Sequence, residues 1–261
     1  MHASLKKLYN HRVLVETLVI RELKARYRGS ILGYFWSFLN PVLLLLVYSF
    51  VFTYIWQPAR GGAPSPYGLF LFCGILPWTW LASSLLESAN SLVSGGSLIK
   101  KVLFPAEVLP LVNVLSNMIH FLSGMVICFV FLVIYHKLTV YALLLPLMVL
   151  IQALFLTGLA FFFAVLSVHL RDLKDLLGNL LLLWFFTTPI IYTADFLPEQ
   201  YRWLLYLNPL THIMMGYQDI LFFGTMFHWK RIIVTALFSL LVFIIGYAVF
   251  DRLRDTIAEE V

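Results

Sequence analysis

Charged side chains are scarce in this sequence of 261 residues. Asp, Glu, Lys and Arg together make up 12% of the residues, whereas hydrophobic residues make up 61%. Because about 25% of the residues in a soluble domain are charged, this composition excludes a water-soluble protein and predicts an integral membrane protein with several spans. Glu16 and Arg21 interrupt the only apolar run near the N-terminus, so we expect no cleaved secretory signal.

Cysteine is rare as well, and the common catalytic motifs are missing. Cys73 and Cys128 lie in apolar stretches without the spacing of a metal site, so we expect two buried apolar side chains rather than a disulfide. The glycine pairs at 61–62 and 95–96 lack the Lys-Ser/Thr of a phosphate-binding loop, and neither His-Glu-x-x-His nor Gly-x-Ser-x-Gly occurs. We therefore expect no catalytic residue, no metal, no cofactor and no nucleic-acid partner on this chain.

Ionisable residues are almost absent from the apolar runs, where only Glu87 and His120 titrate. Glu87 lies near one end of its run, where snorkelling or capping would satisfy it, and His120 lies in the middle of another. We expect structural roles for both, with a Glu87–His120 relay as the alternative. One such pair is weak support for a proton-driven carrier, because carriers and membrane enzymes need ionisable groups at membrane depth.

Long apolar runs are what the sequence has in abundance. A helix needs about 20 apolar residues to cross a bilayer core about 30 Å thick. We predict an all-α polytopic membrane protein that forms one domain over 1–261. It comprises a cytoplasmic interfacial helix in 1–32, a six-helix membrane domain in 33–250 and a cytoplasmic tail in 251–261. The predicted spans are 33–56, 68–92, 108–134, 140–166, 177–192 and 232–250.

Lys and Arg fall mainly on one side of these spans. Most of the 18 residues of these two types lie before the first span, in the second and fourth connections or after the last span. The positive-inside rule then places both termini in the cytoplasm and the protein in the cytoplasmic (inner) membrane.

A polar stripe precedes the first span. Its residues recur at spacings of three, four or seven, with apolar residues largely on the opposite face, which predicts a helix lying in the membrane interface. A solvated helix that leads into the membrane is the alternative. The stripe consists of Lys6, Asn10, Thr17, Arg21, Lys24 and Arg28.

Two connections look structured. Gly95 and Gly96 break the second span, and Pro105 ends a short apolar and basic helix after it. The apolar side chains of that helix must be buried against another surface, either a partner protein or the interfacial helix of the same chain.

Between 193 and 229 the chain is apolar, but Asn208-Pro209 and Gly216 divide it below spanning length. We predict half-helices that re-enter the outer leaflet, since backbone that turns in a membrane must be shielded.

Aromatic residues make up 16% of the chain. Interfacial belts explain those at span ends. Trp184 and Phe185 lie deeper, where flat rings suit the faces of sugars along a path.

Four stretches resemble the permease subunits of type-2 ABC transporters, specifically the exporters of O-antigen, capsule and teichoic acid. They occur in the order typical of that family and span nearly the whole chain. The stretches are 23–36 with Asn40-Pro41, 98–105, 171–173 with 188–192, and 207–211.

This resemblance implies a homodimer of six-helix subunits with a pathway between them, bound to two copies of a separate ATPase subunit that holds ATP and Mg. The segment 97–104 would be the coupling helix that docks in the ATPase, with the interfacial helix 5–28 beside it and the gate helices in 193–229. The docking residues would be Leu98, Ile99, Lys100, Lys101, Leu103 and Phe104.

The resemblance also implies the cargo, an undecaprenyl-pyrophosphate-linked polymer or a teichoic acid precursor. The first and fifth spans would line the channel with Tyr34, Trp36, Trp184, Phe185 and Tyr192. A basic cluster would attract membrane lipid headgroups or the lipid pyrophosphate, at about 1 kcal/mol for each cation near the surface; orientation by the positive-inside rule is the alternative. The cluster is Arg21, Lys24, Arg26 and Arg28. A permease for drugs or lipids and a membrane enzyme acting on lipid-linked sugars are the competing functions.

Overall fold

The computed structural model describes residues 11–51, 64–96, 104–170, 172–225 and 229–260, with side chains up to Arg254 in the last range. These ranges are helical and contain no β-strand. The longer helices are α2 (Arg12–Arg26), α3 (Trp36–Phe50), α4 (Tyr67–Ser94), α6 (Val108–Ile134), α7 (Leu145–His169), α8 (Leu173–Thr187), α10 (Pro209–Gln218) and α11 (Trp229–Glu260). The shorter ones are η1 (Gly33–Phe35), η3 (Val140–Leu144), η4 (Ala194–Phe196), η5 (Glu199–Tyr201), α9 (Arg202–Leu207) and η6 (Asp219–Phe223).

Five helical segments of the described chain are long and apolar enough to cross a membrane. They are Gly33–Phe50, Tyr67–Ser94, Val108–Ile134, Val140–His169 and Trp229–Arg254. The prediction of an all-helical polytopic membrane protein is therefore confirmed. The predicted number of six spans is not, because the fifth predicted span, 177–192, is not among them.

The helix at that place, α8, has 15 residues and ends at Thr187. Pro189 disfavours helical backbone in the residue before it, and Thr188 has extended angles, φ −102° and ψ 135°. At 1.5 Å per residue α8 covers about 22 Å, less than a hydrocarbon core. Helix α11 extends to Glu260, so residues 251–260 of the predicted tail are helical.

Helix α4 forms the centre of the bundle. It packs against α3, α6, α7, α8 and α10, and 19 of its 28 residues are buried. Helices α7 and α11 also pack closely, because small residues face each other there. A Cβ atom on Gly158 would lie 2.6 Å from the Phe243 backbone, and one on Gly246 would collide with the Gly158 carbonyl. Small residues allow this close approach of helices in membranes.

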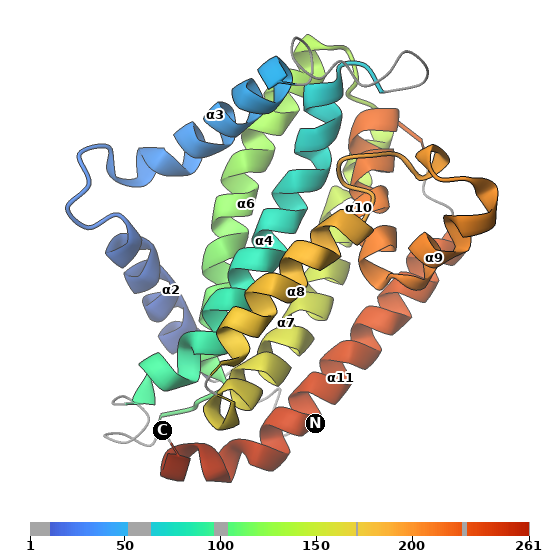
Figure 1. Ribbon diagram of the computed structural model, residues 1–261. Coiled ribbons are helices and arrows are strands. Elements are labelled where there is room, and N and C mark those ends of the chain that lie inside the picture. The colour runs from blue at the N-terminus through green and yellow to red at the C-terminus, as the bar shows by residue number, and fades with distance from the viewer. Residues whose placement is uncertain (1–10, 52–63, 97–103, 171, 226–228, 261) are drawn as a thin grey trace.

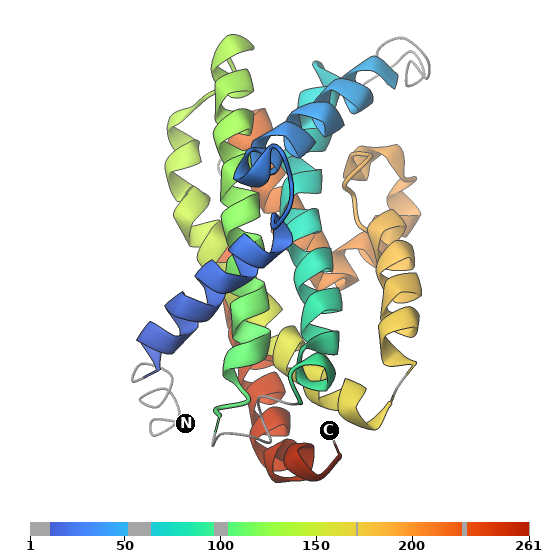
Figure 2. The same cartoon turned by 90° about the vertical axis from the view of Figure 1, so that its left-hand side faces the viewer.

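Helices α2 and α3 lie against one flank of the bundle (Figure 1). The connection between them needs two glycines in left-handed conformation, Gly29 at φ +80° and Gly33 at φ +51°. Figure 2 shows α2 and α3 crossing α6 and α4, while α8 lies on the far side of α4. Both views place the start of α2 and the end of α11 at the same end of the bundle.

Candidate functional site

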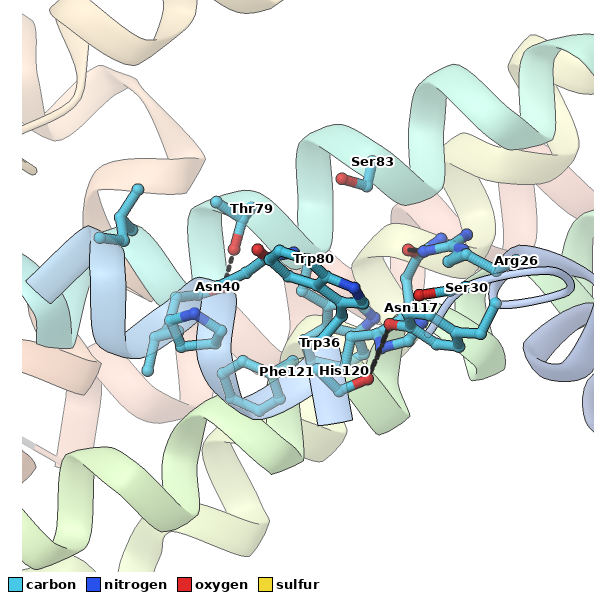
Figure 3. A pocket seen from close by; sticks show the side chains of 15 residues that line it. Arg26, Ser30, Trp36, Asn40, Thr79, Trp80, Ser83, Asn117, His120 and Phe121 are labelled. Carbon is cyan, nitrogen blue, oxygen red and sulfur yellow. Dashed lines mark hydrogen bonds between the residues drawn. The ribbon is translucent and has the colours of Figure 1, made fainter. Parts of the chain in front are cut away.

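A cavity of about 550 Å³ lies between the α2–α3 connection and the helices α4 and α6. Its lining comes from three stretches, Arg26 to Leu44, Leu76 to Ser83, and Asn117 to Phe121. Figure 3 shows Arg26, Ser30 and Asn117 at one end of the lining and Asn40 and Thr79 at the other, with aromatic rings between them. The cavity thus combines one cation, several polar groups and flat apolar surfaces.

The aromatic wall is fixed by packing and one hydrogen bond. Trp80 stacks on Phe121 with 5.0 Å between ring centroids and 21° between ring planes. The indole N–H of Trp80 donates to the Val114 carbonyl at 3.1 Å. Trp36 of α3 also lines the cavity and is only half-buried. Because Trp80 is only 2% exposed, Trp36 is the ring of these two that has surface to offer a bound molecule.

At the polar end of the cavity, three side chains from three helices are all hydrogen-bonded to one another. Arg26 donates to Glu87 Oε1 at 2.7 Å and to Asn117 Oδ1 at 3.1 Å. Asn117 in turn donates to Glu87 Oε2 at 2.6 Å and to the Asn113 carbonyl at 2.9 Å. Each carboxylate oxygen therefore has a partner, and the last residue of α2 is tied to both α4 and α6.

His120 belongs to a second polar group in the same cavity. Its Nδ1 lies 2.9 Å from Ser37 Oγ and 3.3 Å from the Tyr27 hydroxyl, and these two hydroxyls are 2.7 Å apart. Its Nε2 has no polar partner within the described ranges. Among those residues Glu87 and His120 share no hydrogen bond, so the structure offers no support for a relay between them.

The sequence positions of these groups follow the helical period. Thr79, Ser83 and Glu87 recur every four residues on α4, and Asn113 and Asn117 do so on α6, so each set shares a face. Sequence reasoning assigned no role to the polar residues that line this cavity other than Arg26 and His120. Polar residues at spacings of four inside two strongly apolar helices were the signal that could have identified them.

Of the predicted channel residues, only Trp36 lines this cavity, together with Arg26 from the predicted basic cluster. Tyr34 lies beside it, where its hydroxyl is 3.0 Å from Ser123 Oγ and its ring meets Tyr27 edge-on. The other members of the basic cluster, Arg21, Lys24 and Arg28, are exposed.

Trp184, Phe185 and Tyr192 lie away from this cavity, at the end of α8. The Trp184 indole donates to Asn208 Oδ1 at 2.9 Å, Phe185 packs on Trp78 at 5.5 Å, and the Tyr192 hydroxyl donates to the Phe186 carbonyl at 3.1 Å. Within one chain the two predicted halves of a channel lining are therefore on different sides of α4 (Figure 2).

Asn208 organises the junction between α8 and α10. Besides accepting from Trp184, its Oδ1 accepts from the Leu210 backbone N–H at 3.0 Å and caps α10, and its amide donates to Thr188 Oγ1 at 2.9 Å. Gln218 donates to the carbonyls of Pro189 and Ile190 at 3.2 and 3.3 Å. The extended backbone after α8 is thus satisfied by protein groups, which a turn at membrane depth requires.

Five of the six predicted docking residues, Leu98, Ile99, Lys100, Lys101 and Leu103, lie outside the described residues. Phe104 is half-buried against an apolar cluster of α2 and α6 that contains Leu18, Val19, Val108 and Val112. Phe104 therefore packs on the chain's own apolar cluster, and the cover of the rest of the predicted helix stays a prediction.

Comparison with known proteins finds similar sequences along the whole chain. The profile described as ABC-2 type transporter matches residues 13–222. The O-antigen export system permease protein RfbA of Klebsiella pneumoniae is 33% identical over 261 residues, which cover 98% of this chain and 99% of that protein. RfbA of Myxococcus xanthus is 36% identical over 259 residues, 98% of each chain. The polysialic acid transport protein KpsM of Escherichia coli is 24% identical over 259 residues, 94% of each chain.

Proposed function

The chain belongs to the ABC-2 type transporter family, and from this premise we propose that it is the membrane subunit of an ATP-driven polysaccharide exporter. The cargo is a lipid-linked polysaccharide of the O-antigen, capsule or teichoic acid type, which moves from the cytoplasm across the cytoplasmic membrane. The observation that carries this proposal is the match along 98% of the chain to two permeases whose names state O-antigen export.

The transporter is a homodimer in the cytoplasmic membrane, with ATP and Mg held by two copies of a separate ATPase subunit. Both termini are cytoplasmic, and α8 with the extended residues after it makes the sixth crossing. Two observations support this topology, the excess of Lys and Arg on one side and the shared end of the bundle at which α2 begins and α11 ends (Figure 1). The segment 97–104 docks in the ATPase, and 193–225 forms the re-entrant outer gate.

The cavity beside α2 receives the head of the glycolipid. Arg26 binds the pyrophosphate, because a guanidinium donates paired hydrogen bonds to phosphate oxygens. Trp36, which is half-buried, offers its ring to the first sugars, and the buried Trp80 supports the wall of the cavity. The cavity volume of about 550 Å³ is within the roughly 300–1,000 Å³ of small-molecule sites.

The path beyond the cavity runs between the two protomers. The span at Gly33–Phe50 has only 11% of its residues buried, and α8 exposes Leu176, Leu180, Leu182 and Leu183. We place α3 of one protomer near α8 of the other, so that Tyr34 and Trp36 share a lining with Trp184, Phe185 and Tyr192. Replacing both Trp184 and Phe185 with Ala should reduce secretion of full-length polymer while the dimer still assembles. Unchanged secretion would refute the proposal that these two residues line the path.

The function is tested by deleting the gene in the cell of origin and restoring it on a plasmid. Without the chain, the lipid-linked glycan should accumulate inside the cell and disappear from the surface. Restoration should require an ATPase partner that hydrolyses ATP. Surface glycan in the absence of the chain, or with an inactive ATPase, would refute the proposal. Loss of drug or phospholipid export with normal surface glycan would instead support the drug or lipid permease.

A further inference from the structure

The Arg26–Glu87 ion pair stands between two cavities. Arg26 lines the cavity of about 550 Å³ described above. Glu87 lines a second cavity of about 260 Å³ between α2 and the ends of α4 and α6, which begins one helical turn away. The two side chains meet at 2.7 Å, so the pair lies where the linings of the two cavities adjoin. Asn117 lines the first cavity and Asn113, one turn earlier on α6, lines the second.

The second cavity has a polar lining of mixed charge. Its lining contains the cation Arg21 and the polar residues Asn90, Ser91 and Ser94. Glu22 also lines it and supplies a second carboxylate. In the second cavity the Glu87 carboxylate accepts a hydrogen bond from the Arg26 guanidinium at 2.7 Å, so an anion there competes with Glu87 for Arg26.

The ion pair is suited to exchange. The exposed fractions of the Arg26 and Glu87 side chains are 29% and 35%, so neither partner is locked in an apolar core. Pairs with this exposure contribute little to stability, because water screens them. A phosphate group offers a guanidinium the same paired geometry as a carboxylate and carries more negative charge. When Glu87 leaves Arg26, its other oxygen keeps the hydrogen bond from Asn117.

We propose that the Arg26–Glu87 pair is a partition that the phosphate end of a polyprenyl pyrophosphate opens by replacing the Glu87 carboxylate on Arg26. This inference rests on the proposed function, since it assigns a regulation to the same cavity. Glu87 is a positioning residue that holds the cavity closed until an anionic head arrives. Displacement also releases the last turn of α2 from α4, while the apolar cluster around Leu18 and Val108 keeps the rest of α2 on α6.

The binding experiment uses the complete transporter, with its ATPase, in nanodiscs. Radiolabelled farnesyl pyrophosphate is the probe, and binding to empty nanodiscs is subtracted. Glu87→Gln should lower the Kd about fivefold, since it removes the internal competitor of the phosphate. Arg26→Gln should raise the Kd more than tenfold. In the Arg26→Gln background, the additional Glu87→Gln substitution should change nothing.

A matched control is available in the same cavity. Glu22→Gln removes a carboxylate from the second cavity without touching the Arg26–Glu87 contact, so the Kd should stay within about twofold of the unmodified transporter. Glu87→Asp keeps the charge but shortens the side chain, and we expect a smaller tightening than with Glu87→Gln. It also provides a second variant if Glu87→Gln fails to assemble.

The partition itself is tested by cysteine accessibility in inside-out vesicles. Ser83→Cys places a thiol in the first cavity, and Ser94→Cys places one in the second. A membrane-impermeant trimethylammonium thiosulfonate should modify the Ser94→Cys thiol rapidly in every background. Its rate at the Ser83→Cys thiol should rise several-fold with Glu87→Gln or with farnesyl pyrophosphate. The unmodified chain, whose Cys73 and Cys128 are both buried, gives the background rate.

The outcomes distinguish failure of pyrophosphate binding in the first cavity from failure of the partition. If Arg26→Gln binds the probe as tightly as the unmodified transporter, the cavity does not hold the pyrophosphate and the proposed function of the cavity fails. If Arg26→Gln weakens binding but Glu87→Gln changes neither the Kd nor the modification rate of the Ser83→Cys thiol, the cavity still binds the pyrophosphate and the partition is refuted. Inorganic pyrophosphate that binds as tightly as the farnesyl compound would overturn the assignment to a lipid anion.

Discussion

Replacing Asn208 with Ala removes three hydrogen bonds at the junction of α8 and α10. The side chain caps α10 by accepting from Leu210, accepts from the Trp184 indole and donates to Thr188, all between 2.9 and 3.0 Å. Loss of an N-cap costs about 1 kcal/mol. Each of the other two bonds contributes about 1 kcal/mol. We therefore expect the free energy of unfolding to fall by about 3 kcal/mol.

The assay is reversible unfolding by sodium dodecyl sulfate in mixed micelles, followed by tryptophan fluorescence from the seven Trp residues. Asn208→Asp is the control, because a carboxylate still accepts from Leu210 and from the Trp184 indole but cannot donate to Thr188. It should lose only about 1 kcal/mol. The reasoning would be refuted if Asn208→Ala and Asn208→Asp were equally stable, or if Asn208→Ala lay within about 0.5 kcal/mol of the unmodified chain.

Two further predictions concern helix packing and the ATPase contact. Gly158→Leu should prevent α11 from packing on α7, because even a Cβ atom there would lie 2.6 Å from the Phe243 backbone, whereas Gly178→Leu on α8 meets open space and should be tolerated. Size-exclusion chromatography of the two purified variants in detergent checks this, and equal monodispersity would contradict it. Changing Leu98 and Phe104 to Asp should abolish export and leave membrane insertion intact, as read from surface glycan and membrane fractionation. Retained export would refute the assignment of this segment as the ATPase contact. Phe104→Asp alone should also weaken the packing of α2 on the bundle.

The helices that cross the bundle were largely predictable from hydropathy. The predicted span 108–134 coincides with α6, and 68–92 lies within α4. Pro189 was visible in the sequence, but its effect on α8 was underestimated because the apolar composition continues through Ile190 and Ile191. Hydropathy averages over a window and does not register that a proline constrains the single residue before it.

The candidate site was predictable only in part. Trp36 was assigned to the channel lining and Arg26 to a basic cluster for lipid headgroups or pyrophosphate, and both line the cavity. That Arg26 pairs with Glu87, 61 residues away, was not foreseen, and neither was the bond from Trp184 to Asn208. Each of these residues looks ordinary in its own segment, as a basic residue at a membrane edge or an aromatic residue near a span end.

The sequence by itself determined that this chain is a helical membrane protein and roughly where its long helices lie. Those properties depend on local composition and backbone restrictions, which a window of neighbouring residues contains. Only the tertiary structure decided which polar side chains meet, because a contact between α2, α4 and α6 depends on how three helices are rotated and inclined against one another. A helix carries its periodicity in its own sequence, but its partner and angle come from packing against the others.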